Sequence, residues 1–383
     1  MHISIVGPTF PYRGGIAHYT TLLVQHLREI HAVNLYSYRR QYPRLLFPGK
    51  TFDDPSKQPL CAGCEYILDP LLPWTWRKTF TRIRHDNPDL LILQWWTPFW
   101  TPTLYALTYW VRRQTPIPIL FLCHHIIPPD GGPLDWYLAR FVFRRADGFI
   151  VMSEEDYALL RRALPKANIR GTTHPIYDMF NQEPIPRQEA RARLGLDASV
   201  PLLLFFGFVR RYKGLRYLLQ ALPQVHKHLP VHLMVVGEFW EDEQVYRDLL
   251  ERLGLQGSVT LLNRYIPNEE VGAYFSAADV VVLPYLEASQ SGVGQIAFGF
   301  ERPVIATQVG GLAETVEHNG TGLIVPPGDS QALAEAIVRY FQEGLAPRFQ
   351  QAIREVKEQF AWTNLVRLIE QMHSEILKRR AQQ

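Results

Sequence analysis

Residues 280–307 read VVVLPYLEASQSGVGQIAFGFERPVIAT, in which two short apolar runs enclose a loop of small and polar residues. Continuous apolar runs of this length, alternating with amphipathic helices, are typical of parallel sheets that are covered on both faces. A helical pattern begins near Gln295, between the two runs. The stretch therefore predicts a strand, a tight loop and a crossover helix that leads to the next parallel strand.

The same alternation occurs in two rounds along the chain. Apolar runs that predict strands lie at residues 2–7, 31–38, 90–96, 118–124 and 148–153, and again at 201–208, 232–237, 258–263, 280–285, 303–307 and 322–327. Because a chain of 383 residues exceeds what one hydrophobic core usually covers, we predict two doubly wound, Rossmann-like α/β domains.

A polar stretch at residues 177–200 separates the two rounds and resembles a crossing between domains. It predicts an N-terminal domain over residues 1–180 and a C-terminal domain over residues 190–360. The last helical stretch, residues 364–383, is expected to return to the first domain.

The composition is that of an ordinary globular protein. Forty basic and 37 acidic side chains give a formal net charge of +3, which does not indicate a nucleic-acid partner. Cys61 and Cys64 form a single C-x-x-C without the second ligand pair of a structural zinc site, so with Cys123 they are expected to be reduced thiols. The first residues enter directly as a strand, without a secretory signal pattern, and predict a cytoplasmic protein.

Residues 90–111, LLILQWWTPFWTPTLYALTYWV, carry no charge and approach the length of a membrane span. Two prolines, four threonines and Gln94 oppose that interpretation, and the segment starts with a β-type run after the turn signal DNPD. We therefore favour a buried strand followed by a loop and a helix.

Ligands of open parallel sheets bind beyond the carboxyl ends of the strands, so the loops there are the candidate site. After the first strand, Gly14 and Gly15 precede a helix whose N–H groups could approach an anion, although a tight turn that needs glycine explains them equally well. Arg210, Arg211 and Lys213 follow the strand at 201–208. Three cations there suit a diphosphate, whereas a solvated basic trio is the simpler alternative.

The loop after the strand at 280–285 offers a second anion site. Ser289, Ser291, Gly292 and Gly294 are small enough for backbone N–H groups to turn toward a phosphate, with a helix N-terminus behind them. A plain strand-to-helix turn is the alternative, but such a turn seldom needs so many small residues.

Six segments of the chain, in order, resemble the retaining nucleotide-sugar glycosyltransferases of family 4. They are GPTFPYRGGIAHY, FGFVRRYKGL, NRYIPNEEV, AADVVVLPY, SGVGQIAFGFERPVIATQVGGLAE and NGTGLIVPPGD. The resemblance implies the GT-B fold, in which two Rossmann-like domains face each other across a cleft, the N-terminal one binding most of the acceptor and the C-terminal one most of the donor. It also implies retention at the anomeric carbon, no metal and no other cofactor.

The resemblance assigns the donor diphosphate to the backbone amides of Ser291, Gly292 and Val293. It assigns the charge that balances the diphosphate to Arg210 and Lys213. In the same-face mechanism of the family, the departing diphosphate takes the acceptor proton, so cations that stabilise its negative charge matter most.

The chain departs from the family pattern in two places. Many members carry two glutamates separated by seven residues, and here Glu287 is followed at that spacing by Gln295. Aligned on the flanking prolines instead, the two positions are Ala288 and Ile296, and neither is acidic. The usual arginine directly after the strand glycine is Phe208 here, and Arg210 is the expected substitute.

The resemblance also gives roles to residues in other loops. His124 would orient the donor sugar or the acceptor hydroxyl by a hydrogen bond. Tyr265 and Ile266 match the segment that meets the nucleotide base with backbone groups. Glu238, after the strand at 232–237, either faces the ligand or is a solvated glutamate.

Together these patterns predict a metal-independent glycosyltransferase of hexosyltransferase type. Its donor is a nucleotide-diphosphate sugar, and its acceptor is a hydroxyl of a polysaccharide or of a lipid-linked glycan. A dinucleotide oxidoreductase is disfavoured because G-x-G-x-x-G does not follow the first strand and no acidic residue ends the second. A non-catalytic nucleotide-sugar binding protein is the alternative, because the glutamate pair is incomplete.

Two segments of the first domain bear on peripheral contact with the inner face of a membrane. Residues 96–110 are rich in tryptophan and tyrosine, and residues 76–85 are basic. The basic side chains are Arg77, Lys78, Arg82 and Arg84. Amphipathic rings and cations suit an anionic interface. We favour the alternative, in which the tryptophans fill the core and the basic face is solvated.

Overall fold

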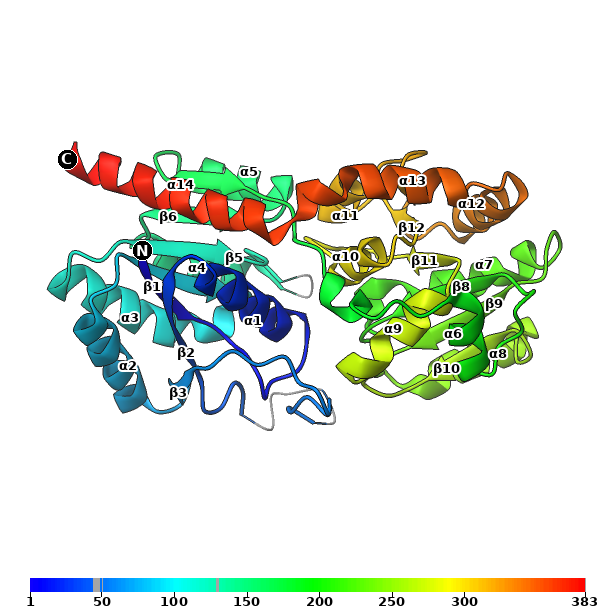
Figure 1. Ribbon diagram of the computed structural model, residues 1–383, viewed down its shortest axis with the longest axis horizontal. Coiled ribbons are helices and arrows are strands. Elements are labelled where there is room, and N and C mark those ends of the chain that lie inside the picture. Colours follow the sequence, from blue (N-terminus) through cyan, green and yellow to red (C-terminus); the bar gives the residue numbers. More distant parts are fainter. Residues whose placement is uncertain (44–48, 50, 129–130, 383) are drawn as a thin grey trace. The chain divides into compact units, whose positions relative to one another are not determined.

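The computed structural model describes residues 1–43, 49, 51–128 and 131–382 (Figure 1). These residues form two compact units. The first comprises Met1–Asp54, Pro59–Thr173 and Trp362–Gln383, and the second comprises Pro55–Gln58 and His174–Ala361. The last helix therefore belongs to the first unit, although it follows the second unit in sequence.

Seven parallel strands form the sheet of the first unit, in the order β3-β2-β1-β4-β5-β6-β7. They are β1 (His2–Val6), β2 (Ala32–Tyr38), β3 (Glu65–Leu68), β4 (Leu90–Trp95), β5 (Ile119–Cys123), β6 (Gly148–Val151) and β7 (Asn168–Gly171). The strand order reverses between β1 and β4, where Ile3 pairs with Leu90. This reversal is the topological switch point of a doubly wound sheet.

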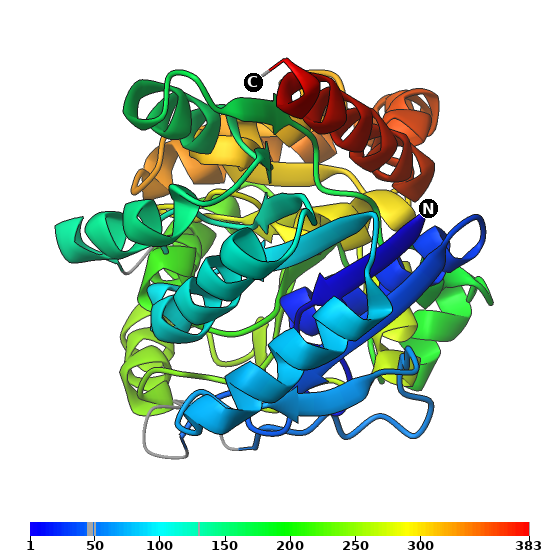
Figure 2. The ribbon, with the colours of Figure 1, turned by 90° about the vertical axis from the view of Figure 1, so that its left-hand side faces the viewer.

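Helices cover both faces of this first sheet. One face packs against α2 (Pro73–Asp86), α3 (Thr101–Gln114), α4 (Pro133–Phe143) and α5 (Glu154–Ala163). The helices α1 (Gly15–Arg28) and α14 (Trp362–Ala381) contact each other. A Cβ added at Gly148 of β6 would lie 2.7 Å from Met372, so α14 packs closely on the sheet. In Figure 2, α2, α3 and α4 form a row, coloured light blue to teal, in front of the strands.

Six parallel strands form the sheet of the second unit, in the order β10-β9-β8-β11-β12-β13. They are β8 (Leu202–Phe206), β9 (His232–Val236), β10 (Val259–Leu262), β11 (Val280–Leu283), β12 (Val304–Thr307) and β13 (Gly322–Val325). Here the order reverses between β8 and β11, where Leu203 pairs with Val280. The second switch point therefore lies between the loops that follow these two strands.

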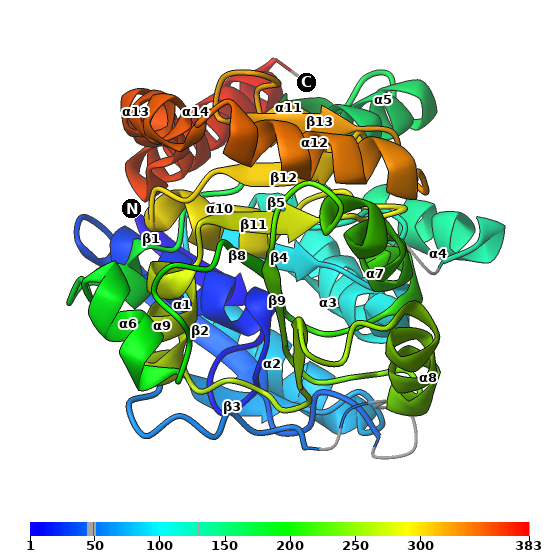
Figure 3. The same cartoon turned by 90° about the vertical axis from the view of Figure 1, so that its right-hand side faces the viewer.

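The second sheet is also covered on both faces. The helices α7 (Leu215–Val225), α8 (Glu243–Leu253) and α12 (Ser330–Gln342) share one core, and they can be followed in Figure 3. The other core contains residues of α6 (Arg187–Arg193), α9 (Asn268–Ala277), α10 (Gly292–Gly299) and α11 (Gly310–Thr315). The helix α13 (Ala346–Val356) contributes to both cores. Short 3₁₀ turns complete the chain: η2 (Pro98–Trp100), η3 (Asp178–Asn181), η4 (Arg211–Lys213) and η5 (Lys357–Phe360).

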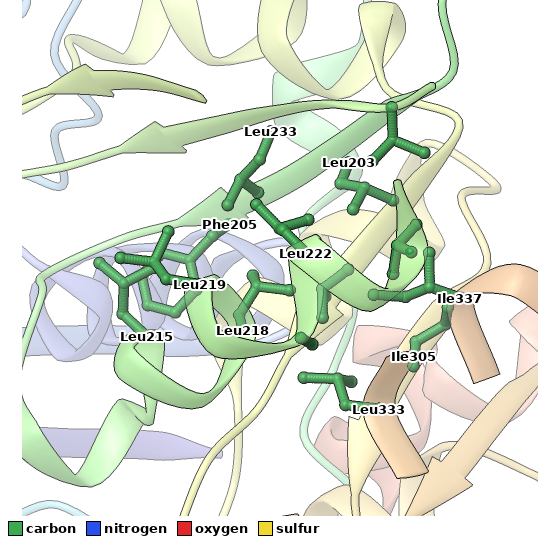
Figure 4. Close-up of a cluster of buried hydrophobic side chains, with 14 of the residues drawn as sticks. Leu203, Phe205, Leu215, Leu218, Leu219, Leu222, Leu233, Ile305, Leu333 and Ile337 are labelled. Atoms are coloured by element: carbon green, nitrogen blue, oxygen red, sulfur yellow. The ribbon is translucent and has the colours of Figure 1, made fainter. Parts of the chain in front are cut away.

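The α7 helix shows how the sequence pattern builds the core. Four leucines recur at the spacing of one helical face and are all buried: Leu215, Leu218, Leu219 and Leu222. They gather with Leu203 and Phe205 of β8 (Figure 4). The intervening strand residues, Leu202 and Leu204, belong to the core on the opposite face, as the two-residue period of a strand requires.

All eleven apolar runs form strands, and the predicted doubly wound sheets are confirmed. The strands β3 and β7 were not predicted, because each is a four-residue edge strand with polar residues in its pattern. Residues 90–111 form β4, η2 and α3, as expected. Within the described part of the chain, no helix is long and apolar enough to cross a membrane. Trp95, Trp96 and Trp100 are buried in the core, as we favoured.

Two segments near the boundaries of the units pack on the second unit. Ser56, which precedes β3 in sequence, accepts a hydrogen bond through Oγ from the N–H of Asn268 at 2.8 Å. This contact satisfies the first N–H of α9, which has no side-chain cap of its own. In the polar stretch 177–200, Arg191 of α6 is fully buried and pairs with Asp279 at 2.7 Å. This stretch is therefore part of the second unit rather than a free connection.

Candidate functional site

The loops that follow β8 and β11 are held against each other at the switch point of the second sheet. The N–H of Leu286 donates to the carbonyl of Tyr212 at 2.6 Å. A Cβ added at Gly214 would lie only 1.9 Å from the carbonyl oxygen of Pro284, and Gly214 has a φ of 68°. Only glycine fits this close approach, so the sequence K-G after η4 fixes how the two loops meet.

Lys213 is the last residue of the η4 turn. The close approach of Gly214 to Pro284 places Lys213 in the interior. Its side chain is buried, and Nζ donates to the hydroxyl of Tyr285 at 3.1 Å. Burial lowers the pKa of Lys213 below its ordinary value, and Lys213 forms no ion pair with a carboxylate among the residues that the structure describes. A buried cation without a carboxylate beside it favours the binding of an anion.

Tyr285 links Lys213 to the start of α10. Its hydroxyl lies 3.4 Å from Oγ of Ser291. Burial raises the pKa of Tyr285 to about 12, so the phenol is neutral at physiological pH. Ser291 is the N-cap of α10 and accepts a hydrogen bond from the N–H of Gly294 at 3.3 Å. These three side chains therefore join a buried cation to a helix N-terminus.

The first turn of α10 supplies further groups for an anion. The N–H groups of Gly292 and Val293 open the helix and have no acceptor within it, and the helix dipole makes this end positive. Gln295 is fully buried, and neither atom of its amide has a hydrogen-bond partner among the described residues. An unpartnered buried amide costs about 1–3 kcal/mol, which marks the position as one that a ligand could complete.

Gly207, directly after β8, keeps space beside these groups. A Cβ added there would lie 3.3 Å from Nζ of Lys213 and 3.4 Å from Cγ2 of Val293. The end of β8, the η4 turn and the start of α10 therefore meet around one point. The sequence predicted both loops as anion sites, and the structure brings them together.

Arg210 lies on an aromatic platform formed by the neighbouring loops. Its guanidinium carbon is 5.2 Å from the ring centroids of both Tyr212 and Trp240. The ring of Phe208 packs against Trp240 in a tilted arrangement, with 4.5 Å between centroids. The phenylalanine that replaces the family's arginine thus helps to hold Arg210 in place by contacts with Trp240.

The residues predicted for the nucleotide base lie next to this platform. The ring of Tyr265 is 6.0 Å from that of Phe208, and Ile266 is buried in the core behind it. Glu238 is also buried and accepts a hydrogen bond from Nε1 of Trp240 at 3.1 Å. The alternative in which Glu238 is a solvated glutamate is therefore wrong.

The surroundings of Glu287, Arg211 and Gly292 bear on the roles that the sequence predicted for these loops. Glu287 is exposed, and no ion pair is recorded for it within the part of the chain that the structure describes. Arg211 is exposed and, with Arg216, lines a separate cavity of about 400 Å³. A Cβ added at Gly292 would lie 3.4 Å from Cε2 of Tyr177, so a larger side chain there would press on a buried ring rather than on a phosphate.

The first unit has a corresponding set of loops at its own switch point. The N-cap of α1 is Gly14, with a φ of 108°, and a Cβ added at Gly15 would meet nothing within 4 Å. The position that a Cβ would take at Gly15 is therefore open. One turn further, Nε2 of His18 lies 3.2 Å from Oδ2 of Asp54. The sequence did not single out this pair, although His18 lies in the segment GPTFPYRGGIAHY.

His124, after β5, is buried and held between two elements of this switch point. Its Nε2 lies 2.6 Å from Oε1 of Gln94 on β4, and its ring meets that of Tyr19 edge-on, 4.6 Å away. In this arrangement Nε2 carries the proton, and the amide of Gln94 fixes the orientation of the imidazole. In the sequence, the only sign of the role of Gln94 was that one polar residue interrupts the apolar run LLILQWW.

Residues 1–43, 49, 51–128 and 131–382 contain no group of three or more histidine, cysteine, aspartate or glutamate side chains that could hold a metal ion.

Both halves of the chain match models of known sequence families. Residues 13–171 match the family described as Glycosyltransferase Family 4, and residues 200–343 match Glycosyl transferases group 1. The chain belongs to the family 4 glycosyltransferases. Both switch-point loops of the second unit lie inside the second match, and the loops of Gly14 and His124 lie inside the first.

Individual glycosyltransferases match shorter parts of the chain. A D-inositol 3-phosphate glycosyltransferase of Corynebacterium urealyticum is 34% identical over 157 residues, which are 39% of this chain and 37% of that protein. An alpha-D-kanosaminyltransferase of Streptomyces kanamyceticus is 24% identical over 215 residues, 55% of each chain. The matched part thus spans about half the length, or less, of these two relatives.

Solved structures match the whole chain. A sucrose-phosphate synthase from Thermosynechococcus elongatus has a TM-score of 0.74 at 24% identity, covering 99% of both chains. Anabaena HepE in complex with UDP has a TM-score of 0.75 at 18% identity, covering 98% of this chain and all of the other, and it has also been solved with UDP-glucose. These likenesses confirm the predicted GT-B fold.

Proposed function

We propose that this protein is a retaining glycosyltransferase that moves a sugar from a nucleotide-diphosphate-sugar donor to an acceptor hydroxyl. The observation that carries the proposal is the buried Lys213, joined through Tyr285 to the N-terminus of α10 at the switch point of the second sheet. A buried cation beside a positive helix end is unfavourable unless an anion binds there. A diphosphate supplies both the charge and the acceptor oxygens.

The donor class is supported by the relatives, since HepE has been solved with UDP and with UDP-glucose. In the proposed complex, the N–H groups of Gly292 and Val293 and the hydroxyl of Ser291 bind the diphosphate. Arg210 and Lys213 balance its charge. Gly14 and Gly15 are proposed as further donor-binding residues, and Tyr265 and Ile266 would lie beside the base.

The chemistry that we propose needs no base from the protein. The bond between the anomeric carbon and the diphosphate oxygen breaks, and the acceptor oxygen bonds to the same carbon on the same face. The acceptor proton passes to the departing diphosphate. The protein acts mainly by stabilising the negative charge on that leaving group, an effect worth about 2.7–4 kcal/mol for one donor group. The family resemblance supports this retaining, metal-independent course.

A panel of donors and acceptors tests the proposed function. We expect the purified chain to release nucleoside diphosphate from one class of UDP-, GDP- or ADP-sugar, faster when a hydroxyl acceptor is added, and to keep the anomeric configuration in the product. A non-catalytic binding protein would hold the donor in calorimetry without turning it over. That outcome would replace the proposal by the alternative drawn from the incomplete glutamate pair.

The contact between Gln94 and His124 gives a prediction for the first unit. We expect Gln94→Leu to lower kcat by roughly tenfold to a hundredfold with little change in donor Kd, because the imidazole loses the group that orients it. Gln94→Glu keeps an acceptor at the same place and should retain more activity. Its carboxylate would also raise the pKa of the imidazole, so the pH profile should shift upward. If both variants lost the same fraction of kcat and their pH profiles were unchanged, Gln94 would have a packing role only.

A further inference from the structure

The first unit exposes large apolar side chains on neighbouring helices. Among the described residues, ten large apolar side chains are exposed, and half of them lie on α2, α3 and α4. These five are Trp74, Tyr109, Leu134, Tyr137 and Phe141. The three helices lie side by side on one face of the sheet (Figure 2). Scattered exposed apolar residues need no explanation, but a gathering on adjacent helices marks an interaction surface.

The α4 helix carries an apolar stripe that faces away from the core. Leu134 is 68% exposed, Tyr137 64% and Phe141 47%, and their spacing of three and four residues places them on one side of the helix. The core-facing side of α4 is supplied by other residues, including Val142 and Phe143, which are buried. The helix is therefore apolar on two sides, and on the side away from the core the side chains of Leu134 and Tyr137 are largely exposed.

Stacked rings and arginines extend this stripe onto α3. The ring of Phe141 stacks on Tyr105 at 4.4 Å between centroids, and the guanidinium of Arg145 lies 4.1 Å above Tyr105. The guanidinium of Arg113 lies 5.3 Å from the ring of Tyr109. We call these residues, together with Leu134 and Tyr137, the aromatic–arginine face. Its cations lie among its rings rather than apart from them.

The charge of this side of the molecule is strongly positive. The helices α2, α3 and α4 contain seven arginine or lysine residues and two aspartates, in a chain whose formal net charge is only +3. Two of these cations pair with carboxylates of other elements, Arg82 with Glu65 and Arg112 with Asp147, so five cations remain against the two aspartates. The exposed charge that a partner would meet is therefore positive.

We propose that the aromatic–arginine face docks on an anionic membrane surface. Leucine, tyrosine and phenylalanine on one side of a helix suit the boundary between headgroups and acyl chains, and arginines beside them suit phosphate headgroups. A second copy of the chain would present the same positive charge and be repelled. Nucleic acid would gain nothing from an exposed leucine, so Leu134 favours lipid.

The surface that we propose to contact the membrane differs from the one that the sequence indicated. Trp95, Trp96 and Trp100 fill the core, so they cannot contact a membrane, and the apolar part of the contact moves to α4. Docking itself does not depend on catalysis. The further step, that the acceptor hydroxyl belongs to a lipid-linked molecule, rests on the proposed function.

Co-sedimentation with vesicles tests the docking without any assay of sugar transfer. We expect the protein to bind vesicles of phosphatidylglycerol and phosphatidylcholine at low salt, to be released as salt is added, and not to bind phosphatidylcholine alone. Leu134→Ser with Tyr137→Ser should weaken binding about tenfold while binding still responds to salt. Arg113→Glu with Arg145→Glu should weaken it at least as much, by reversing the charge.

Matched controls come from exposed residues elsewhere. Val245 and Leu377 are 45% and 48% exposed on α8 and α14, two helices that do not contribute to the aromatic–arginine face. Val245→Ser with Leu377→Ser should bind vesicles as the unchanged protein does. Absence of binding at low salt, or equal binding to neutral vesicles, would overturn the proposal. Binding that Leu134→Ser with Tyr137→Ser does not weaken would also overturn it, because the contact would then lie on another surface, with the basic side of α2 as the next candidate.

Discussion

Replacing Lys213 by methionine is expected to lower kcat/KM by about two to three orders of magnitude and to make the ligand-free protein more stable. The loss of activity follows if Lys213 stabilises the leaving diphosphate, since one such stabiliser contributes about 2.7–4 kcal/mol and 1.36 kcal/mol corresponds to a factor of ten. The gain in stability follows because methionine fills the same space without a buried charge. We expect that gain to be on the order of 1 kcal/mol near neutral pH.

The gain in stability should depend on pH in a defined direction. Burial lowers the pKa of Lys213 in the folded protein from its ordinary value of 10.5. Between the lowered pKa and 10.5, the unfolded chain binds more protons than the folded one, so the unfolding free energy contributed by this group rises with pH. Lys213→Met should lack this rise. Chemical denaturation from neutral to alkaline pH measures the difference between the two proteins.

Arg211→Ala is the matched control for Lys213→Met. Arg211 is two residues away and carries the same charge, but it is exposed and lines another cavity. Its removal should leave kcat/KM within about twofold, because an exposed charge is screened by water and salt. Near-normal transfer by Lys213→Met would show that the leaving group is bound elsewhere. Equal losses of kcat/KM in Lys213→Met and Arg211→Ala would show that only the summed charge matters.

Most of the fold could be predicted because it depends on local patterns. A buried parallel strand is an uninterrupted apolar run, and eleven such runs became strands. The edge strand β7, NIRG, has one neighbour and two exposed residues, so its sequence carries little of that signal. The association of Ser56 with α9 joins residues 212 positions apart, and no local pattern encodes such a contact.

The site could be predicted as a set of loops but not as a geometry. Arg211 and Lys213 look alike in the sequence, and only the close approach of Gly214 to Pro284 decides which of them is buried. Glu287 was grouped with Gln295 because of their spacing, yet one is exposed and the other fully buried. Residues that act through packing, such as Tyr285, carried no sequence signal beyond their place after a strand.

The sequence also could not show which apolar side chains of a helix are exposed. The α4 segment PLDWYLARFVF is apolar enough for a core helix, and its pattern does not say which of its sides meets the sheet. The buried Val142 and the exposed Tyr137 are both apolar, so only the neighbouring helices distinguish them. The aromatic–arginine face therefore became visible only in the structure.

Ser291→Asp is expected to lower the affinity for the nucleoside diphosphate of the donor more than about a hundredfold without loss of stability. Aspartate is as good an N-cap as serine, so the cap of α10 should persist, and its charge suits a helix N-terminus. The hydroxyl of Tyr285, 3.4 Å from Ser291 Oγ, can donate to the new carboxylate. In the ligand-free protein the carboxylate would therefore take the place of the anion that we propose for this site.

The loss of affinity follows from repulsion between that carboxylate and the diphosphate. Two unit charges about 4 Å apart interact by about 4 kcal/mol at the effective dielectric constant typical of protein surfaces, about 20, which is more than a hundredfold in Kd. Calorimetry with the nucleoside diphosphate that the donor panel identifies, and thermal unfolding of the same samples, measure the two effects together. The unfolding temperature should stay the same or rise, because the carboxylate also offsets the buried charge of Lys213.

Ser291→Asn separates charge from shape in this experiment. Asparagine has nearly the size of aspartate and caps helices equally well, but it is neutral. We expect it to keep the affinity for the same nucleoside diphosphate within about tenfold of the unchanged protein. Equal losses in the two variants would mean that Ser291 matters only for the space it leaves. If Ser291→Asp kept its full affinity, the diphosphate would bind away from α10, because a phosphate bound at this helix N-terminus cannot avoid a carboxylate on its N-cap.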